Sequence, residues 1–117
     1  MLETLLAEIR KFNDERDWAK FHSPKNLATS VLIEAAELAE IFQWLTEEES
    51  RTLGHKAKIH AEEEIADVFI YLLNLADKLG IDPVEASHRK ILQNGKKYPV
   101  NSSRGNRLKY TEFTDIK

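Results

Sequence analysis

Apolar residues recur at helical spacing along most of the chain, with charged and polar residues between them. In residues 2–18 the apolar residues on one face are Leu2, Leu5, Leu6, Ile9 and Phe12. The same spacing returns in residues 24–45 and in residues 55–79. A period near 3.6 residues is typical of an amphipathic helix, and no segment shows the alternation typical of a strand. The pattern therefore predicts an all-α fold.

Start signals mark two of the predicted helices. Ser23 precedes Pro24, and Asp82 precedes Pro83. A polar cap followed by proline is a frequent helix start, because the cap accepts a hydrogen bond from a free backbone N–H and proline has none to leave unpaired. Asp82 therefore begins a fourth predicted helix, residues 83–97.

Further signals set the remaining boundaries. Gly80 suits the left-handed conformation that ends a helix, and Pro99 stops the fourth one. Residues 46–54 begin with a capping-box pattern and fit either a short helix or a loop. We therefore predict one all-α, four-helix-bundle-like domain over residues 1–100, followed by an irregular basic tail over residues 101–117.

The charges divide the chain into an acidic part and a basic part. The formal net charge of the 117 residues is −3. Residues 1–85 carry 18 acidic and 9 basic side chains, whereas residues 86–117 carry 2 and 8. An acidic body would repel a nucleic-acid backbone, so nucleic acid is not an expected partner. The division fits either a solvated acidic body with a basic tail or a site for a metal-bound polyphosphate.

The composition excludes several classes of protein. The chain has no cysteine, which rules out a disulfide scaffold, Cys-ligated zinc and a thiol nucleophile. Its longest apolar run, residues 68–73, is far shorter than the ~20 residues that a membrane-spanning helix needs. Residues 1–4 carry an acid where a signal peptide carries bases. We therefore expect no membrane partner and a cytoplasmic location.

Four carboxylates form two pairs at i, i+3 spacing on the second and third predicted helices. Glu34 falls near the centre of the apolar stripe of its helix, and Glu37 lies one turn further on. Glu64 and Asp67 border the apolar stripe of the third helix, beside Tyr71. A carboxylate in an apolar stripe is costly unless it is paired or bound to a metal. We therefore expect the two helices to bring the four carboxylates around one metal site.

The ligand types restrict the metal. Neither pair contains the histidine of the Glu-x-x-His pairs found in di-iron bundles. Ligation by oxygen alone favours a hard ion, Mg²⁺, with Mn²⁺ as an alternative. Protein-bound Mg²⁺ is commonly shared between carboxylates and substrate phosphates. The expected cofactor would thus connect the acidic helices with the basic segment after residue 85.

The order of these residues is similar to that of a known family. Glu34-x-x-Glu37 and Glu64-x-x-Asp67 resemble the E-x-x-E…E-x-x-D signature of the MazG-like all-α nucleoside triphosphate pyrophosphohydrolases, and within them the small dCTP pyrophosphatase branch. Three further stretches carry the resemblance, namely residues 15–27, 37–44 and 90–111. The similarity extends over residues 5–113.

The resemblance implies hydrolysis of a deoxynucleoside triphosphate, dCTP or a modified dCTP, to the monophosphate and pyrophosphate, with a metal-activated water attacking the α-phosphorus. It implies that Glu34, Glu37, Glu64 and Asp67 are the Mg²⁺ ligands. Glu37 or Glu64 is then the expected general base. The expected substrate-binding residues are Trp18, His22, Asn26, Trp44, Tyr71, Lys90, Asn94, Lys97 and Tyr98.

Several alternatives stay open at this point. Related bundles act on dUTP or phosphoribosyl-ATP, and a non-catalytic helical interaction module could keep the same scaffold. Trp18 and Trp44 could be ordinary core aromatics. The apolar stripes of the second and third helices are wider than one subunit easily covers, so we expect a homodimer or a homotetramer.

Overall fold

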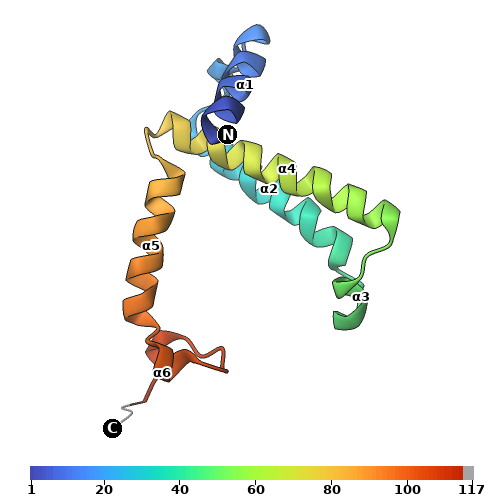
Figure 1. Cartoon of the computed structure of the whole chain (residues 1–117). Coiled ribbons are helices and arrows are strands. Elements are labelled where there is room, and N and C mark those ends of the chain that lie inside the picture. Colours follow the sequence, from blue (N-terminus) through green and yellow to red (C-terminus); the bar gives the residue numbers. More distant parts are fainter. Residues whose placement is uncertain (115–117) are drawn as a thin grey trace. The chain divides into compact units, whose positions relative to one another are not determined.

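The computed structural model describes residues 1–114, and its regular elements over these residues are all helices (Figure 1). The predicted all-α class is therefore confirmed. The α-helices are α1 (Leu2–Glu15), α2 (Pro24–Phe42), α3 (Glu47–Arg51), α4 (His55–Lys78), α5 (Pro83–Lys97) and α6 (Val100–Ser103). Two short 3₁₀ helices are Ala19–Phe21 and Tyr110–Glu112. The last part of the predicted basic tail, residues 115–117, lies outside the described residues.

The predicted caps are confirmed. Ser23 Oγ accepts a hydrogen bond from the backbone N–H three residues later, at 3.2 Å, and so begins α2. Asp82 Oδ1 accepts from two backbone N–H groups of the first turn of α5, at 3.0 and 3.1 Å. Gly80 follows α4 with a φ of +67°, a conformation that is costly for any residue with a Cβ. These local signals place the helix boundaries from the sequence alone.

Two predicted helix ends were wrong, and one open segment is now defined. The first helix ends at Glu15 rather than at residue 18, since Asp17 adopts a left-handed φ of 53° that a helix cannot continue through. The helix α2 ends at Phe42 rather than at residue 45. Between α2 and α4 the chain forms the short helix α3, which begins with a capping box between Thr46 and Glu49.

The chain divides into two compact units, and the first is Met1–Ile81. Within it α2 and α4 run antiparallel along each other, and α1 packs on α4 (Figure 1). Its buried apolar residues are Ile9, Leu27, Ala61 and Leu73. The guanidinium of Arg10 on α1 binds both carboxylate oxygens of Asp77 on α4, with Nε–Oδ2 at 2.9 Å. The helices that carry the four predicted metal ligands therefore form one packed hairpin.

Several large apolar side chains of this unit remain exposed. They include Leu32, Ile33, Ile65, Phe69 and Leu72 on α2 and α4, and Trp44 after α2. Leu32 is 70% exposed and Ile33 is 53% exposed, which is unusual for residues in the middle of a long helix. Such apolar surface is typical of a face that another protein surface covers.

The second unit begins at Asp82 and contains α5, α6 and the second 3₁₀ helix. In this unit the Tyr98 ring packs edge-on against the Tyr110 and Phe113 rings, with centroids 5.9 and 5.8 Å apart.

The predicted domain over residues 1–100 and the predicted tail from residue 101 stay predictions. Among the described residues, no helix is long and apolar enough to cross a membrane.

Candidate metal and nucleotide site

Three of the four predicted ligands come together between α2 and α4. Glu34 and Glu37 on α2 and Glu64 on α4 each offer a carboxylate oxygen, and these three oxygens lie within 4.8 Å of one another. We call these three residues the glutamate triad. The sequence placed Glu34 and Glu37 on one helix face, and the pairing of α2 with α4 supplies the third carboxylate.

The triad brings buried carboxylate oxygens close together. Glu34 Oε2 and Glu64 Oε2 are buried, and neither has a hydrogen-bond partner in the described part of the chain. Burial, reinforced by the neighbouring Glu37 carboxylate, raises the pKa of Glu34 from 4.5 to about 7. The charges of Asp67 and Glu64 act in the same direction. Neighbouring carboxylates with unpartnered oxygens fit a divalent cation. The cation would coordinate these oxygens and favour the ionised form of the carboxylates.

Glu64 has a second neighbour that the sequence analysis did not single out. His60 Nε2 lies 3.4 Å from Glu64 Oε1, one turn earlier on α4. Glu64 is largely covered, whereas His60 is more than half exposed. The i, i+4 spacing of the two residues was the available signal. His60 leaves Glu64 Oε2 free, so one oxygen of this carboxylate remains available to a ligand.

Asp67, the fourth predicted ligand, is not part of the glutamate triad. It lies one turn after Glu64 on α4 and lines a pocket beside the triad. Its charge nevertheless reaches Glu34, where it helps to raise the pKa. Asp67 therefore links the glutamate triad, through its charge, with the lining of the pocket.

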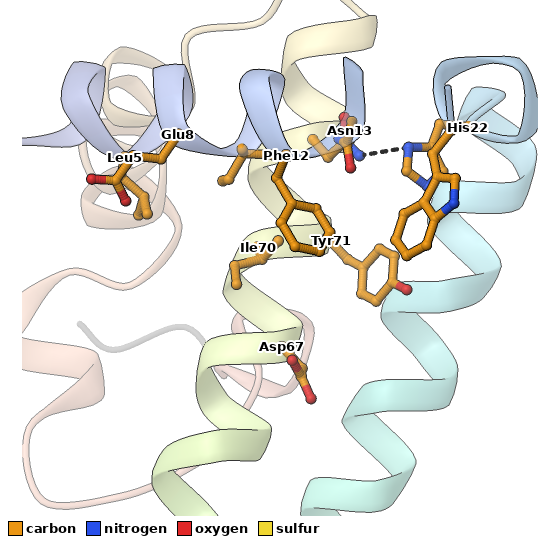
Figure 2. Close-up of a pocket in the computed structure, with 11 residues that line it drawn as sticks. Leu5, Glu8, Phe12, Asn13, His22, Asp67, Ile70 and Tyr71 are labelled. Atoms are coloured by element: carbon orange, nitrogen blue, oxygen red, sulfur yellow. Dashed lines mark hydrogen bonds between the residues drawn. The ribbon is translucent and has the colours of Figure 1, made fainter. Parts of the chain in front are cut away.

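That pocket has a volume of about 380 Å³ and is walled by α1 and α4 (Figure 2). Leu5, Glu8, Phe12 and Asn13 enter from α1, and Asp67, Ile70 and Tyr71 enter from α4. The complete lining is Leu5, Glu8, Ile9, Phe12, Asn13, Trp18, His22, Asp67, Ile70, Tyr71 and Asn74. A mostly apolar pocket with a few polar groups, next to a cluster of carboxylates, is typical of a small-molecule site.

Three predicted substrate-binding residues line this pocket. Trp18 packs edge-on against Phe12, at 5.6 Å between centroids, and against His22, at 6.2 Å. Tyr71 lies one turn after Asp67 on α4. The left-handed backbone at Asp17 immediately precedes Trp18, so the turn that ends α1 also brings the tryptophan to the pocket.

The polar pocket residue Asn74 was not predicted from the sequence. Its side chain is buried, and its Nδ2 lies 3.1 Å from His22 Nδ1. Asn13 and Glu8 on the α1 wall were also not expected. The signal for Asn74 was its place within the apolar run of α4, between Leu73 and Leu75, where an amide needs a partner.

Two other predicted substrate-binding residues of the first unit lie outside the pocket lining. Asn26 Nδ2 donates a hydrogen bond to the carbonyl oxygen of Phe21, at 3.0 Å, and so holds the first 3₁₀ helix against the start of α2. Trp44 follows α2 and is 86% exposed. Their roles in binding stay predictions.

The remaining predicted substrate-binding residues belong to the second unit. Lys90, Asn94 and Lys97 lie on α5, and Tyr98 follows it. Lys97 Nζ stands 5.1 Å from the centre of the Tyr110 ring, a cation–π contact. Their participation in one site with the glutamate triad stays a prediction.

Comparison with known proteins decides the family. The MazG-like family profile matches residues 29–113, which include the whole glutamate triad. The chain belongs to the MazG-like family. This MazG-like chain is 39% identical to dCTP pyrophosphatase 1 of Bos taurus and 40% identical to that of Homo sapiens; each comparison covers 95% of this chain and 69% of the relative. A crystal structure of a pyrophosphatase from Archaeoglobus fulgidus is 52% identical, with a TM-score of 0.79 over 83% of this chain and 91% of that one.

Proposed function

We propose that this MazG-like protein is a nucleoside triphosphate pyrophosphohydrolase that converts dCTP, or a modified dCTP, to dCMP and pyrophosphate. The observation that carries the proposal is the glutamate triad with its unpartnered buried oxygens beside an aromatic-lined pocket. Carboxylates that could hold a metal, next to a small-molecule pocket, are what a nucleotide-hydrolysing site requires. The names of the similar proteins, dCTP pyrophosphatase 1 and pyrophosphatase, support the same reaction.

The proposed cofactor is Mg²⁺, with Mn²⁺ as an alternative. Glu34, Glu37 and Glu64 would hold it, and Asp67 would complete the set from the pocket side. These ligands are all carboxylates, the donor type that both ions prefer. Bound there, the ion would neutralise triphosphate charge and make a coordinated water more acidic.

The chain's own part in the reaction is to orient the substrate and accept a proton. Water attacks the α-phosphorus, and a carboxylate of Glu37 or Glu64 takes its proton. The new P–O bond forms as the bond from the α-phosphorus to the bridging oxygen breaks, so pyrophosphate departs with the electron pair. Lys90 and Lys97 are proposed to balance the charge of the departing phosphates.

The pocket is proposed to hold the base. The Trp18 and Tyr71 rings offer faces for stacking, and His22 offers a polar group at the same pocket. A volume of about 380 Å³ is within the range of small-molecule sites. Asn26, Trp44, Asn94 and Tyr98 remain proposed substrate contacts. The cytoplasmic location stays a prediction, and a free nucleotide as substrate is compatible with it.

A homodimer or homotetramer is proposed to cover the exposed apolar faces of α2 and α4. Leu32, Ile33 and Ile65 are each more than half exposed, although they lie within long helices. Burying them against a second copy removes apolar surface from water, the main driving force of association. Light scattering at micromolar concentration should give a mass at least twice that of one chain, and a monomer would contradict the assembly.

A nucleotide panel tests the proposed reaction. Canonical and modified dNTPs are incubated with the protein in Mg²⁺ or EDTA, and the products are separated by chromatography. We expect dCMP and pyrophosphate from dCTP only when the metal is present. In ¹⁸O-labelled water the label should enter dCMP, because the α-phosphorus is attacked; label in pyrophosphate would refute that site of attack.

The same panel separates the alternatives. A ranking led by dUTP or phosphoribosyl-ATP would assign the same chemistry to another substrate. No monophosphate from any nucleotide would support a non-catalytic interaction module instead. The glutamate triad favours the enzyme, because an interaction module gains nothing from carboxylates whose buried oxygens have no partner.

A further inference from the structure

A buried asparagine forms part of the pocket wall between α1 and α4. Asn74 is 5% exposed and is the one buried polar residue among those the structure describes. A buried amide is costly unless it is hydrogen-bonded. Asn74 Nδ2 meets this need through His22 Nδ1, at 3.1 Å (dashed in Figure 2, where Asn74 is drawn without a label).

This contact determines which nitrogen of His22 carries the proton. As the Asn74 amide is oriented, its NH₂ group faces His22 Nδ1 and can only donate, so Nδ1 accepts and has no proton. In a neutral imidazole the proton is then on Nε2. Burial, together with the charge of Lys78, lowers the pKa of His22 and so favours the neutral ring. Asn74 thus makes His22 a hydrogen-bond donor at Nε2.

His22 and Asn74 both line the pocket that is proposed to hold the base, and the Trp18 ring meets His22 edge-on. An N–H group distinguishes the two common pyrimidines, because N3 of cytosine has a free lone pair whereas N3 of uracil carries a hydrogen. A donor facing a donor leaves both groups unpaired and repelling each other.

We propose that Asn74 is a positioning residue that holds His22 as an Nε2–H donor, and that this donor selects cytosine over uracil through N3 of the base. The inference rests on the proposed function and deepens it by assigning the source of base selectivity. Modified cytosines with substituents at C5 keep the N3 lone pair and should accept the same hydrogen bond from His22.

The test reverses the hydrogen bond. In Asn74→Asp the new carboxylate accepts from Nδ1–H of His22, so at pH 8.5 the neutral ring presents a lone pair at Nε2. We expect the ratio of kcat/KM for dCTP to that for dUTP to fall about tenfold, mainly through KM for dCTP, as for one lost hydrogen bond in a site. His22→Phe keeps a ring without the donor, and it should lower the same ratio even if the buried charge keeps Asn74→Asp from folding.

The tautomer is measured directly by ¹⁵N NMR of the His22 ring, which requires no turnover. We expect a protonated Nε2 and an unprotonated Nδ1 in the unmodified protein, and the reverse in Asn74→Asp. Asn13→Asp makes the same chemical change in the same pocket without a bond to His22, and should leave the His22 tautomer unchanged.

The outcomes separate the inference from the proposed function. Hydrolysis of dCTP by the unmodified protein, with an unchanged dCTP to dUTP ratio in both variants, would overturn the inference alone. A proton found on Nδ1 in the unmodified protein would do the same. An unmodified protein that does not hydrolyse dCTP would overturn the proposed function and the selectivity with it.

Discussion

Replacing Glu34 with glutamine should stabilise the metal-free protein in alkaline solution. Burial and the neighbouring carboxylates raise the pKa of Glu34 from 4.5 to about 7. An acid with a raised pKa contributes stability below its unfolded value, near pH 4.5, and this stability is lost as the pH rises through about 7. Glutamine has the same shape and cannot ionise, so Glu34→Gln loses nothing over that range.

The size of the effect follows from the shift. Each pKa unit corresponds to 1.36 kcal/mol, so the difference between 4.5 and about 7 sets an upper limit of about 3 kcal/mol. Glu34 is partly exposed, and solvent screening reduces the gain. We therefore expect the free energy of unfolding of Glu34→Gln to exceed that of the unmodified protein by about 1–3 kcal/mol at pH 8, and the difference to vanish near pH 4.5.

Denaturant unfolding in EDTA at pH 4.5, 6 and 8 measures this difference. Mg²⁺ should reverse the order at pH 8, because only the intact triad gains binding energy, about 2.7 kcal/mol at a free Mg²⁺ concentration 100 times Kd. Glu63→Gln, an exposed change on α4, is the control and should show neither effect. The reasoning is refuted if Glu34→Gln is no more stable than the unmodified protein at pH 8 in EDTA.

The other predictions concern the scaffold that holds the site. Leu27→Ala, at a position with no exposed surface, should lower the free energy of unfolding by about 2–5 kcal/mol in urea denaturation. Asp77→Asn should lower the melting temperature at pH 7, because it removes the ion pair with Arg10. Arg10 lowers the pKa of Asp77 below its ordinary 3.8, so the ion pair stabilises the fold above pH 3.8 and this stabilisation is lost on further acidification. The melting temperatures of the variant and the unmodified protein should therefore converge below pH 3.8. Asp17→Val should lower the free energy of unfolding by about 1–2 kcal/mol, because a β-branched residue must then adopt a φ of 53°. Asp17→Gly should lower it less, because glycine adopts a positive φ readily.

The helix boundaries could be predicted where a local side chain makes them. Ser23 and Asp82 each accept backbone hydrogen bonds at the start of a helix, and Gly80 needs no neighbour to adopt a positive φ. The early end of α1 could not be predicted in this way. Asp17 is not glycine, and it adopts its left-handed conformation in the turn that places Trp18 against Phe12.

The grouping of the carboxylates could be predicted only in part for a related reason. Helical spacing shows which carboxylates of one helix share a face, as Glu34 and Glu37 do, and the pairing of α2 with α4 brings Glu64 to them. The same spacing does not show how far each side chain reaches, and Asp67 lines the pocket instead of joining the triad. Asn74 was missed because its partner, His22, is 52 residues away in the sequence.

The reaction products of dCTP in the presence of Mg²⁺, with the unmodified protein and with Glu64→Gln, test the central claim most directly. We predict equimolar dCMP and pyrophosphate from the unmodified protein and from the control Glu63→Gln, and turnover lower by a factor of at least about 100 in Glu64→Gln, the usual scale for losing a general base or metal ligand. Circular dichroism would confirm that the variants fold. Undiminished turnover by a folded Glu64→Gln variant would contradict the assignment of the reaction to the glutamate triad.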